Sequence, residues 1–167
     1  MKPKDCLVTA VQIAEANGGE RKTHFLNPNA DRLRLSLGDA VGLKNLGVHI
    51  VTIEPGRDST EYHRHFHEEE CFFVLSGKAR LRIDDESFTI GAGDFAGFPV
   101  NDGAGSAAHA IHNDSDEDFV MLVMGQRLAT DVADYPDQNK RLYRHDNHWD
   151  LVDKDKLTHP QPRGKTS

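Results

Sequence analysis

The chain has 167 residues, of which 37% are hydrophobic and 28% are charged, and its formal net charge is −7. This length suits a single globular domain, and the composition is typical of one. The acidic balance and the lack of clustered Lys and Arg argue against nucleic-acid binding, and every apolar run is too short to span a membrane. With only two cysteines and no apolar leader at the start, we expect a reduced compartment, the cytoplasm.

Short strands separated by turn residues are expected through the middle of the chain. Residues 33–37 alternate with period two, and the β-branched stretch 47–53 ends at a Pro-Gly turn. Further strands are predicted at 71–75, 78–83, 87–90, 94–98, 108–112 and 119–124, and no helix is predicted before residue 126. Gly and Pro recur between these strands at a spacing of roughly 8–12 residues, which predicts an all-β sandwich or barrel.

Both ends of the chain lack this pattern. Residues 1–29 are predicted to form an N-terminal arm, 30–127 the β-barrel, and 128–167 a polar C-terminal arm. Pro160, Pro162 and Gly164 lie near the end, which is predicted to be disordered. Such arms can cover a sheet edge or embrace a second subunit, so a homodimer is expected.

The run His63-Arg64-His65-Phe66-His67-Glu68-Glu69-Glu70 predicts a metal site. Alternate side chains of a strand share one face, so His63 and His65 would lie about 6.6 Å apart on the same side. Two imidazoles at that spacing can bind one ion together with a carboxylate, for which Glu68, Glu69 and Glu70 all compete. His109 is a fourth candidate ligand, and three nitrogens with one oxygen suit a divalent transition metal.

These motifs resemble the two motifs of the cupin family, small double-stranded β-helix or jelly-roll barrels. The first motif is a Gly, a His-x-His pair, a Glu and a Gly, and it reads here as Gly56, His63, His65, Glu70 and Gly77. The second reads as Gly93, Pro99, Gly103 or Gly105, His109 and Asn113. The resemblance covers residues 47–125, with one extra residue before His63 and a longer loop between Pro99 and His109. It implies a single cupin barrel flanked by the two arms.

The resemblance also implies the ligand set His63, His65, Glu70 and His109. The six residues between Glu70 and Gly77 fit the family pattern and favour Glu70 over Glu68 and Glu69. His67 shares its strand parity with His63 and His65, so it is an alternative ligand or a neighbour of the site. The metal would be Zn, Mn, Fe or Ni, because the ligand set alone does not distinguish them.

Within the family, the chain most resembles short single-domain cupins similar to mannose-6-phosphate isomerase. This implies an isomerase of a sugar or sugar phosphate, with Glu70 or His67 moving the proton and a small polar metabolite as substrate. Arg80 and Arg82 share one face of a strand and could hold an anionic group, although an exposed face explains them equally well. The alternative functions are an Fe(II) dioxygenase and a non-catalytic module that binds a metal or small ligand, since one fold hosts all three.

Overall fold

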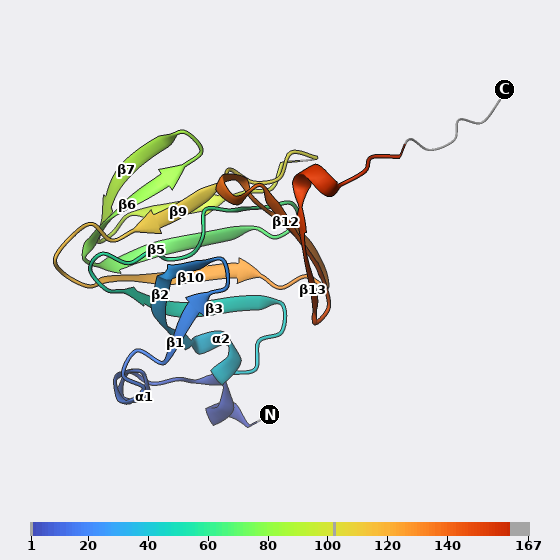
Figure 1. Cartoon of the computed structure of the whole chain (residues 1–167). Coiled ribbons are helices and arrows are strands. Elements are labelled where there is room, and N and C mark those ends of the chain that lie inside the picture. The colour runs from blue at the N-terminus through green and yellow to red at the C-terminus, as the bar shows by residue number, and fades with distance from the viewer. Residues whose placement is uncertain (1, 102, 161–167) are drawn as a thin grey trace.

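The computed structural model describes residues 2–101 and 103–160, and these form three antiparallel sheets (Figure 1). The largest sheet has the order β1-β2-β3-β10-β5-β8. Its strands are β1 (Glu20–His24), β2 (Asn27–Ser36), β3 (Leu46–Ile53), β10 (Phe119–Gln126), β5 (Glu70–Ser76) and β8 (Phe95–Phe98). A three-stranded sheet has the order β7-β6-β9, formed by β7 (Glu86–Gly91), β6 (Lys78–Ile83) and β9 (His109–His112). The predicted all-β jelly-roll is therefore confirmed.

The main core lies between these two sheets. Alternate residues of each strand point inward, as in Phe72 and Val74 of β5 and Ala79 and Leu81 of β6, and all four are buried. Phe119 of β10 opposes Ile53 of β3, and both are completely buried. This packing fixes the register, because a shift by one residue would turn every apolar side chain outward.

The N-terminal segment is partly built into the largest sheet. The predicted arm 1–29 contains a 3₁₀ turn (Pro3–Cys6), helix α1 (Ala10–Glu15), strand β1 and the start of β2. A second short helix, α2 (Leu37–Ala40), follows β2, so the prediction of no helix before residue 126 was wrong. Both helices are too short to show an apolar period, and the local signal for α1 is its capping box between Thr9 and Gln12.

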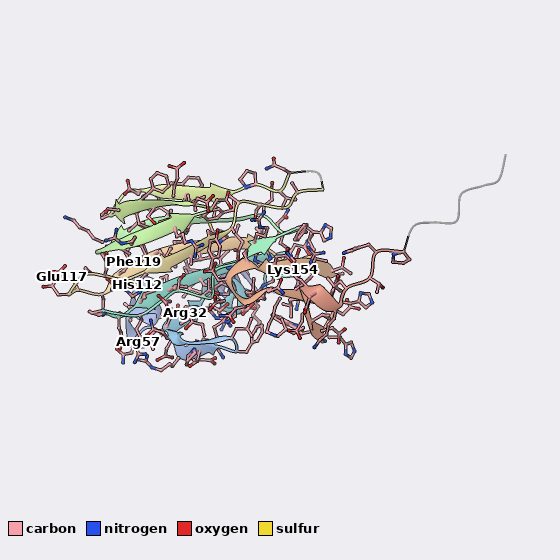
Figure 2. All side chains as sticks on the ribbon, turned by 45° about the horizontal axis from the view of Figure 1, so that its top comes forward. Arg32, Arg57, His112, Glu117, Phe119 and Lys154 are labelled. Atoms are coloured by element: carbon pink, nitrogen blue, oxygen red, sulfur yellow. The ribbon has the colours of Figure 1, made fainter. Side chains whose placement is uncertain are left out.

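The C-terminal segment forms a third sheet. Strands β11 (Thr130–Tyr135), β12 (Lys140–His145) and β13 (His148–Asp153) pair in the order β13-β12-β11-β4, where β4 is Arg64–His65. Figure 2 shows Lys154, at the end of this sheet, on the opposite side of the molecule from Glu117. The predicted C-terminal arm is thus a sheet at one end of the jelly-roll. The end predicted to be disordered lies, from residue 161 onward, outside the described residues, and the predicted boundaries at 30 and 127 stay predictions.

A small apolar cluster attaches this sheet to the rest of the molecule. Ala133, Tyr135 and Leu142 are buried together, and Leu26 from the turn between β1 and β2 packs against them. The turn between β1 and β2 therefore meets the C-terminal sheet at one end of the jelly-roll. No helix in the described part of the chain is long and apolar enough to cross a membrane.

Candidate metal centre and cavity

The four predicted metal ligands come together at the short strand β4 and at the first residues of β5 and β9. His65 belongs to β4, Glu70 is the first residue of β5, and His109 is the first residue of β9. His63 lies just before β4 and exchanges two backbone hydrogen bonds with His109, with N–O distances of 3.2 and 2.8 Å. The paired backbones place both imidazoles side by side, with ring centroids 4.7 Å apart.

One oxygen of Glu70 is the meeting point of the three imidazoles. Glu70 Oε2 lies 3.6 Å from Nε2 of His63, 3.4 Å from Nε2 of His65 and 3.4 Å from Nε2 of His109. The ligand atoms of His63, Glu70 and His109 all lie within 4.8 Å of one another, and His65 adjoins this group through Glu70. Two donors at about 2.1 Å from an ion with a tetrahedral angle between them are about 3.4 Å apart, so this spacing fits one transition metal.

The other ring nitrogen of each histidine contacts an acceptor. His63 Nδ1 lies 2.9 Å from the Glu61 carbonyl, His109 Nδ1 lies 3.3 Å from the Ala107 carbonyl, and His65 Nδ1 lies 2.6 Å from Asp131 Oδ2. Because carbonyl and carboxylate oxygens only accept, each Nδ1 carries the proton and donates it. Nε2 is then the nitrogen available to a metal, and partners of this kind orient the rings of metal-binding histidines.

The electrostatics of this group differ from one side chain to the next. Burial is the main reason that the pKa of His63 is lowered to about 4. For His65, burial is outweighed by the hydrogen bonds to Asp131 and Glu70, and its pKa is raised to about 10. Burial would raise the pKa of Glu70, but the three histidines hold it well below its usual value, so Glu70 stays ionised. A bound cation would replace the Nε2 proton of His65, because a metal ligand must offer a lone pair.

The competing carboxylates and His67 have other surroundings. The Glu68 carboxylate accepts a hydrogen bond from the Leu128 backbone N–H at 2.6 Å and pairs with Arg144. Glu68, His65 and Asp131 are themselves close enough to share an ion, although Glu68 is already neutralised by Arg144. The side chains of Glu69 and His67 are exposed and do not line the cavity described below. Glu70 is therefore the carboxylate that meets all three imidazoles.

Two neighbours leave the ligands little freedom to move. The Phe98 ring stacks on the His109 ring with centroids 3.6 Å apart and planes within 7°. Gly125 of β10 opposes Glu70, and a Cβ at this position would lie only 3.3 Å from Glu70 Cγ. The Phe98 ring therefore restricts the His109 ring, and the glycine at position 125 leaves room for the Glu70 side chain.

The metal ligands line a cavity of about 450 Å³. On one side the inner face of β2 and β3 contributes Arg32, Arg34 and His49, and on another the C-terminal sheet contributes Asp131, Tyr135, Arg144 and Trp149. Arg32, which is labelled in Figure 2, is half-buried. A cavity of this size, mainly apolar with a few convergent polar groups, is typical of small-molecule sites.

The predicted anion-binding residues Arg80 and Arg82 do not line this cavity. They alternate along β6 with the buried Ala79 and Leu81 and therefore point outward. Arg80 pairs with Asp114, with a distance of 2.9 Å from Nε. Arg82 pairs with Asp137 at 2.6 Å and lies over the Tyr62 ring. The structure instead brings Arg32 and Arg34 to the cavity.

Asp131 and Tyr135 also line the cavity, and the sequence did not predict them as site residues. Both belong to β11, far from the cupin-like motifs, and they reach the site because Ala133 pairs with His65 of β4. The local signal was weak, since one Asp and one Tyr at alternate positions of a polar segment are common on an exposed strand.

Known proteins resemble this chain in sequence and in fold. Residues 49–125 match the family model described as the cupin domain. The fold resembles a crystal structure described as a "putative sugar phosphate isomerase" from Acidithiobacillus ferrooxidans, with a TM-score of 0.90 and 49% identity over 96% of this chain and 100% of that one. It also resembles a sugar phosphate isomerase from a cupin superfamily of Silicibacter pomeroyi, with a TM-score of 0.72 and 32% identity over 83% of this chain and 92% of that one. No protein with a curated description matches.

Proposed function

This chain belongs to the cupin family, and we propose that it is a metal-dependent isomerase of a sugar or sugar phosphate. The observation that carries the proposal is the convergence of three Nε2 atoms on Glu70 Oε2 at the wall of the cavity. The descriptions of the two similar proteins support the reaction and the substrate class. We assign His63, His65, Glu70 and His109 as ligands of one divalent transition metal.

The bound metal would act as a Lewis acid on adjacent oxygen atoms of the substrate. Interconversion of an aldose and a ketose moves one proton between neighbouring carbons and another between their oxygens, so the reaction needs no co-reactant. The chain must supply a group that removes the carbon-bound proton and returns it one atom away.

We assign this proton transfer to Oε1 of Glu70. Oε2 is directed at the three histidines, whereas no hydrogen bond reaches Oε1 from the described residues. The other carboxylates that line the cavity are occupied, Glu68 by Arg144 and Asp131 by His65. His67, the other predicted proton carrier, has an exposed side chain outside the cavity lining, which favours Glu70.

We assign Tyr135 as a hydrogen-bond donor to a substrate oxygen. Its ring is buried 6.2 Å from the His63 ring, and within the described chain its hydroxyl makes no hydrogen bond. Burial and the nearby carboxylates of Glu61, Asp131 and Glu70 raise the pKa of Tyr135 above its usual value. The hydroxyl therefore stays protonated and able to donate throughout the neutral pH range.

The test combines metal analysis with an exchange assay. Protein purified without added metal is analysed by mass spectrometry and then incubated anaerobically in D₂O with aldoses, ketoses and their phosphates. We expect close to one transition metal per chain, interconversion of one sugar pair, and deuterium at the carbon next to the carbonyl. Glu70→Gln should abolish the exchange, and the matched control Glu69→Gln should retain it, because the Glu69 side chain is exposed.

Other outcomes would favour the competing functions. Oxygen consumption with one iron per chain and no anaerobic exchange would contradict the isomerase and point to a dioxygenase. Thermal stabilisation by a ligand without turnover would point to a binding module. Full metal content in both His63→Ala and His109→Ala would remove the proposed metal site itself.

A further inference from the structure

Two arginines in the cavity form no ion pair with any carboxylate of the described residues. Arg32 and Arg34 lie two residues apart on β2, so their side chains leave the same face of the strand. Both line the cavity that contains the His63–Glu70–His109 group. Neither guanidinium lies within 4 Å of a carboxylate in the described part of the chain, since none of the ion pairs found there includes them.

Seven of the eight other arginines in the described part of the chain behave differently, and the exception is Arg57, which donates to the side-chain oxygen of Asn29. The seven that form an ion pair with a carboxylate are Arg21, Arg64, Arg80, Arg82, Arg127, Arg141 and Arg144. The chain has 27 Asp and Glu against 20 Lys and Arg, so carboxylates are not scarce. Arg32 and Arg34 therefore lack an ion pair with a described residue although carboxylates are abundant, whereas Arg144 in the same cavity has one.

Donors of both guanidiniums remain available. Arg32 uses Nη1 to donate to the Ser59 carbonyl, and no hydrogen bond of the Arg34 side chain is found among the described residues. A guanidinium offers five N–H donors in a planar fork that matches the oxygens of a phosphate. Two such forks on one wall leave enough donors to surround a phosphate group.

Holding these charges side by side has an energetic cost. Burial is the largest cause of the lowered pKa of Arg32, the neighbouring Arg34 adds to it, and the attraction of Glu70 does not offset them. A buried charge without a counter-charge is destabilising, so the site is suited to an anion that supplies one. Arg32 and Glu70 line the same cavity, so the charge of Arg32 lies near the proposed metal site.

A third polar group faces the same region. His49 of β3 is paired with Ser36, while Arg34 is paired with Val51, so His49 and Arg34 are diagonal neighbours on one face of the sheet. His49 Nδ1 is buried and has no hydrogen-bond partner among the described side chains and backbone. An anionic ligand with several oxygens could reach this nitrogen as well, if Nδ1 carries the proton.

We propose that Arg32 and Arg34 bind the phosphate group of a phosphorylated sugar whose hydroxyl end reaches the His63–Glu70–His109 group. The anion site stands on the two unpaired guanidiniums, whereas the identity of the ligand as a sugar phosphate rests on the proposed function. The inference makes the substrate a phosphate ester rather than a neutral sugar. It also moves phosphate recognition from the outer Arg80 and Arg82 to the inner face of β2.

The test measures binding with and without the phosphate group. Inorganic phosphate, fructose 6-phosphate and fructose are titrated calorimetrically into the full metal-loaded chain, its Arg34→Gln variant and its Arg80→Gln variant. Arg34 is the better target, because Arg32 also holds the Ser59 carbonyl. We expect Arg34→Gln to weaken binding of both phosphate compounds by about tenfold or more, since charge-assisted hydrogen bonds are lost. Arg80→Gln should bind like the wild type, and Arg34→Lys should lose less affinity than Arg34→Gln.

The outcomes separate this inference from the proposed function. Phosphate binding that depends on Arg34 but occurs without isomerisation would refute the isomerase and leave the anion site standing. Equal binding by the wild type and Arg34→Gln, or no binding of millimolar phosphate by the wild type, would overturn the inference. Gluconate binding that depends on Arg34, without binding of either phosphate compound, would assign the site to a carboxylate and equally refute a phosphate site. Circular dichroism of each variant checks that the fold is retained.

Discussion

Replacing Asp131 with Asn should weaken metal binding while the chain keeps its fold. Asp131 Oδ2 lies 2.6 Å from His65 Nδ1, while Oδ1 accepts the backbone N–H groups of His67 and Glu68 at 3.1 and 3.3 Å. In Asp131→Asn the amide oxygen can keep the two backbone hydrogen bonds, so the NH₂ group takes the place of Oδ2. Two donors would then face each other unless His65 moves its proton from Nδ1 to Nε2.

The magnitude of the effect follows from this change of tautomer. With the proton on Nε2, His65 offers no lone pair to a metal beside Glu70. Loss of a partner that orients a metal-binding histidine lowers metal affinity by about 10- to 100-fold, or about 1.4 to 2.7 kcal/mol. Asp131 is only 4% exposed, so solvent offers no easy substitute for its carboxylate. We therefore expect an effect toward the upper part of this range.

Competition with a chelator of known affinity measures the metal dissociation constant of each variant. The matched control is Asp134→Asn, because Asp134 lies on the same strand, is similarly buried and holds Arg141 and Lys154 rather than a histidine. We expect Asp134→Asn to lower stability against urea while its metal affinity stays close to that of the wild type. Wild-type metal affinity in Asp131→Asn, or an equal loss in Asp134→Asn, would refute the reasoning.

Three further predictions test the surroundings of the site. Gly125→Ala should lower metal occupancy without unfolding the chain, because the new Cβ would lie 3.3 Å from Glu70 Cγ, and mass spectrometry with thermal denaturation would check both. Burial, with a smaller contribution from Arg32, lowers the pKa of His24 to about 4, so its neutral form stabilises the fold above pH 6.5 and this contribution is lost as the pH falls toward 4. The stability difference between the wild type and His24→Gln, from urea titrations, should shrink over that range; a constant difference would contradict the prediction. The expected homodimer can be tested with Phe95→Asp on the edge strand β8, since Phe95 is 64% exposed, and light scattering should then show a dimer for the wild type and a monomer for the variant.

The sequence was most informative where the chemistry is local. His63, His65 and Glu70 lie within eight residues, and strand parity predicts that the two histidines share a face. The choice of Glu70 over Glu68 and Glu69 came from the resemblance to the cupin motif. His109 could be added only through the second motif, because its pairing with His63 joins distant parts of the chain. The motifs therefore predicted that these four side chains lie close together, whereas their role as metal ligands is part of the proposed function.

The C-terminal sheet could not be predicted from the sequence, because the contacts that position it join distant parts of the chain. Its attachment depends on two backbone pairs between β11 and β4, and on apolar contacts that join Leu26 to Tyr135 across most of the chain. Neither interaction leaves a local pattern, and the segment has no long apolar stretch. Asp131 and Tyr135 therefore became visible as site residues only when the strand pairing was known.

Alternation along a strand usually predicts that apolar residues face inward and charged residues face solvent. The arginines of β2 are an exception, because they face the cavity. On β6 the ordinary rule holds, because Ala79 and Leu81 face the core and Arg80 and Arg82 point outward. On β2 the same rule would turn Leu33 inward, yet Arg32 and Arg34 line the cavity and Leu33 lies beneath Gly18 of the N-terminal segment. On this outer face Leu33 and Leu35 are half-buried, so the apolar residues of β2 are not in the main core. A strand whose arginines face inward without an ion pair to a described carboxylate breaks a local rule, and such violations are expected where a ligand binds.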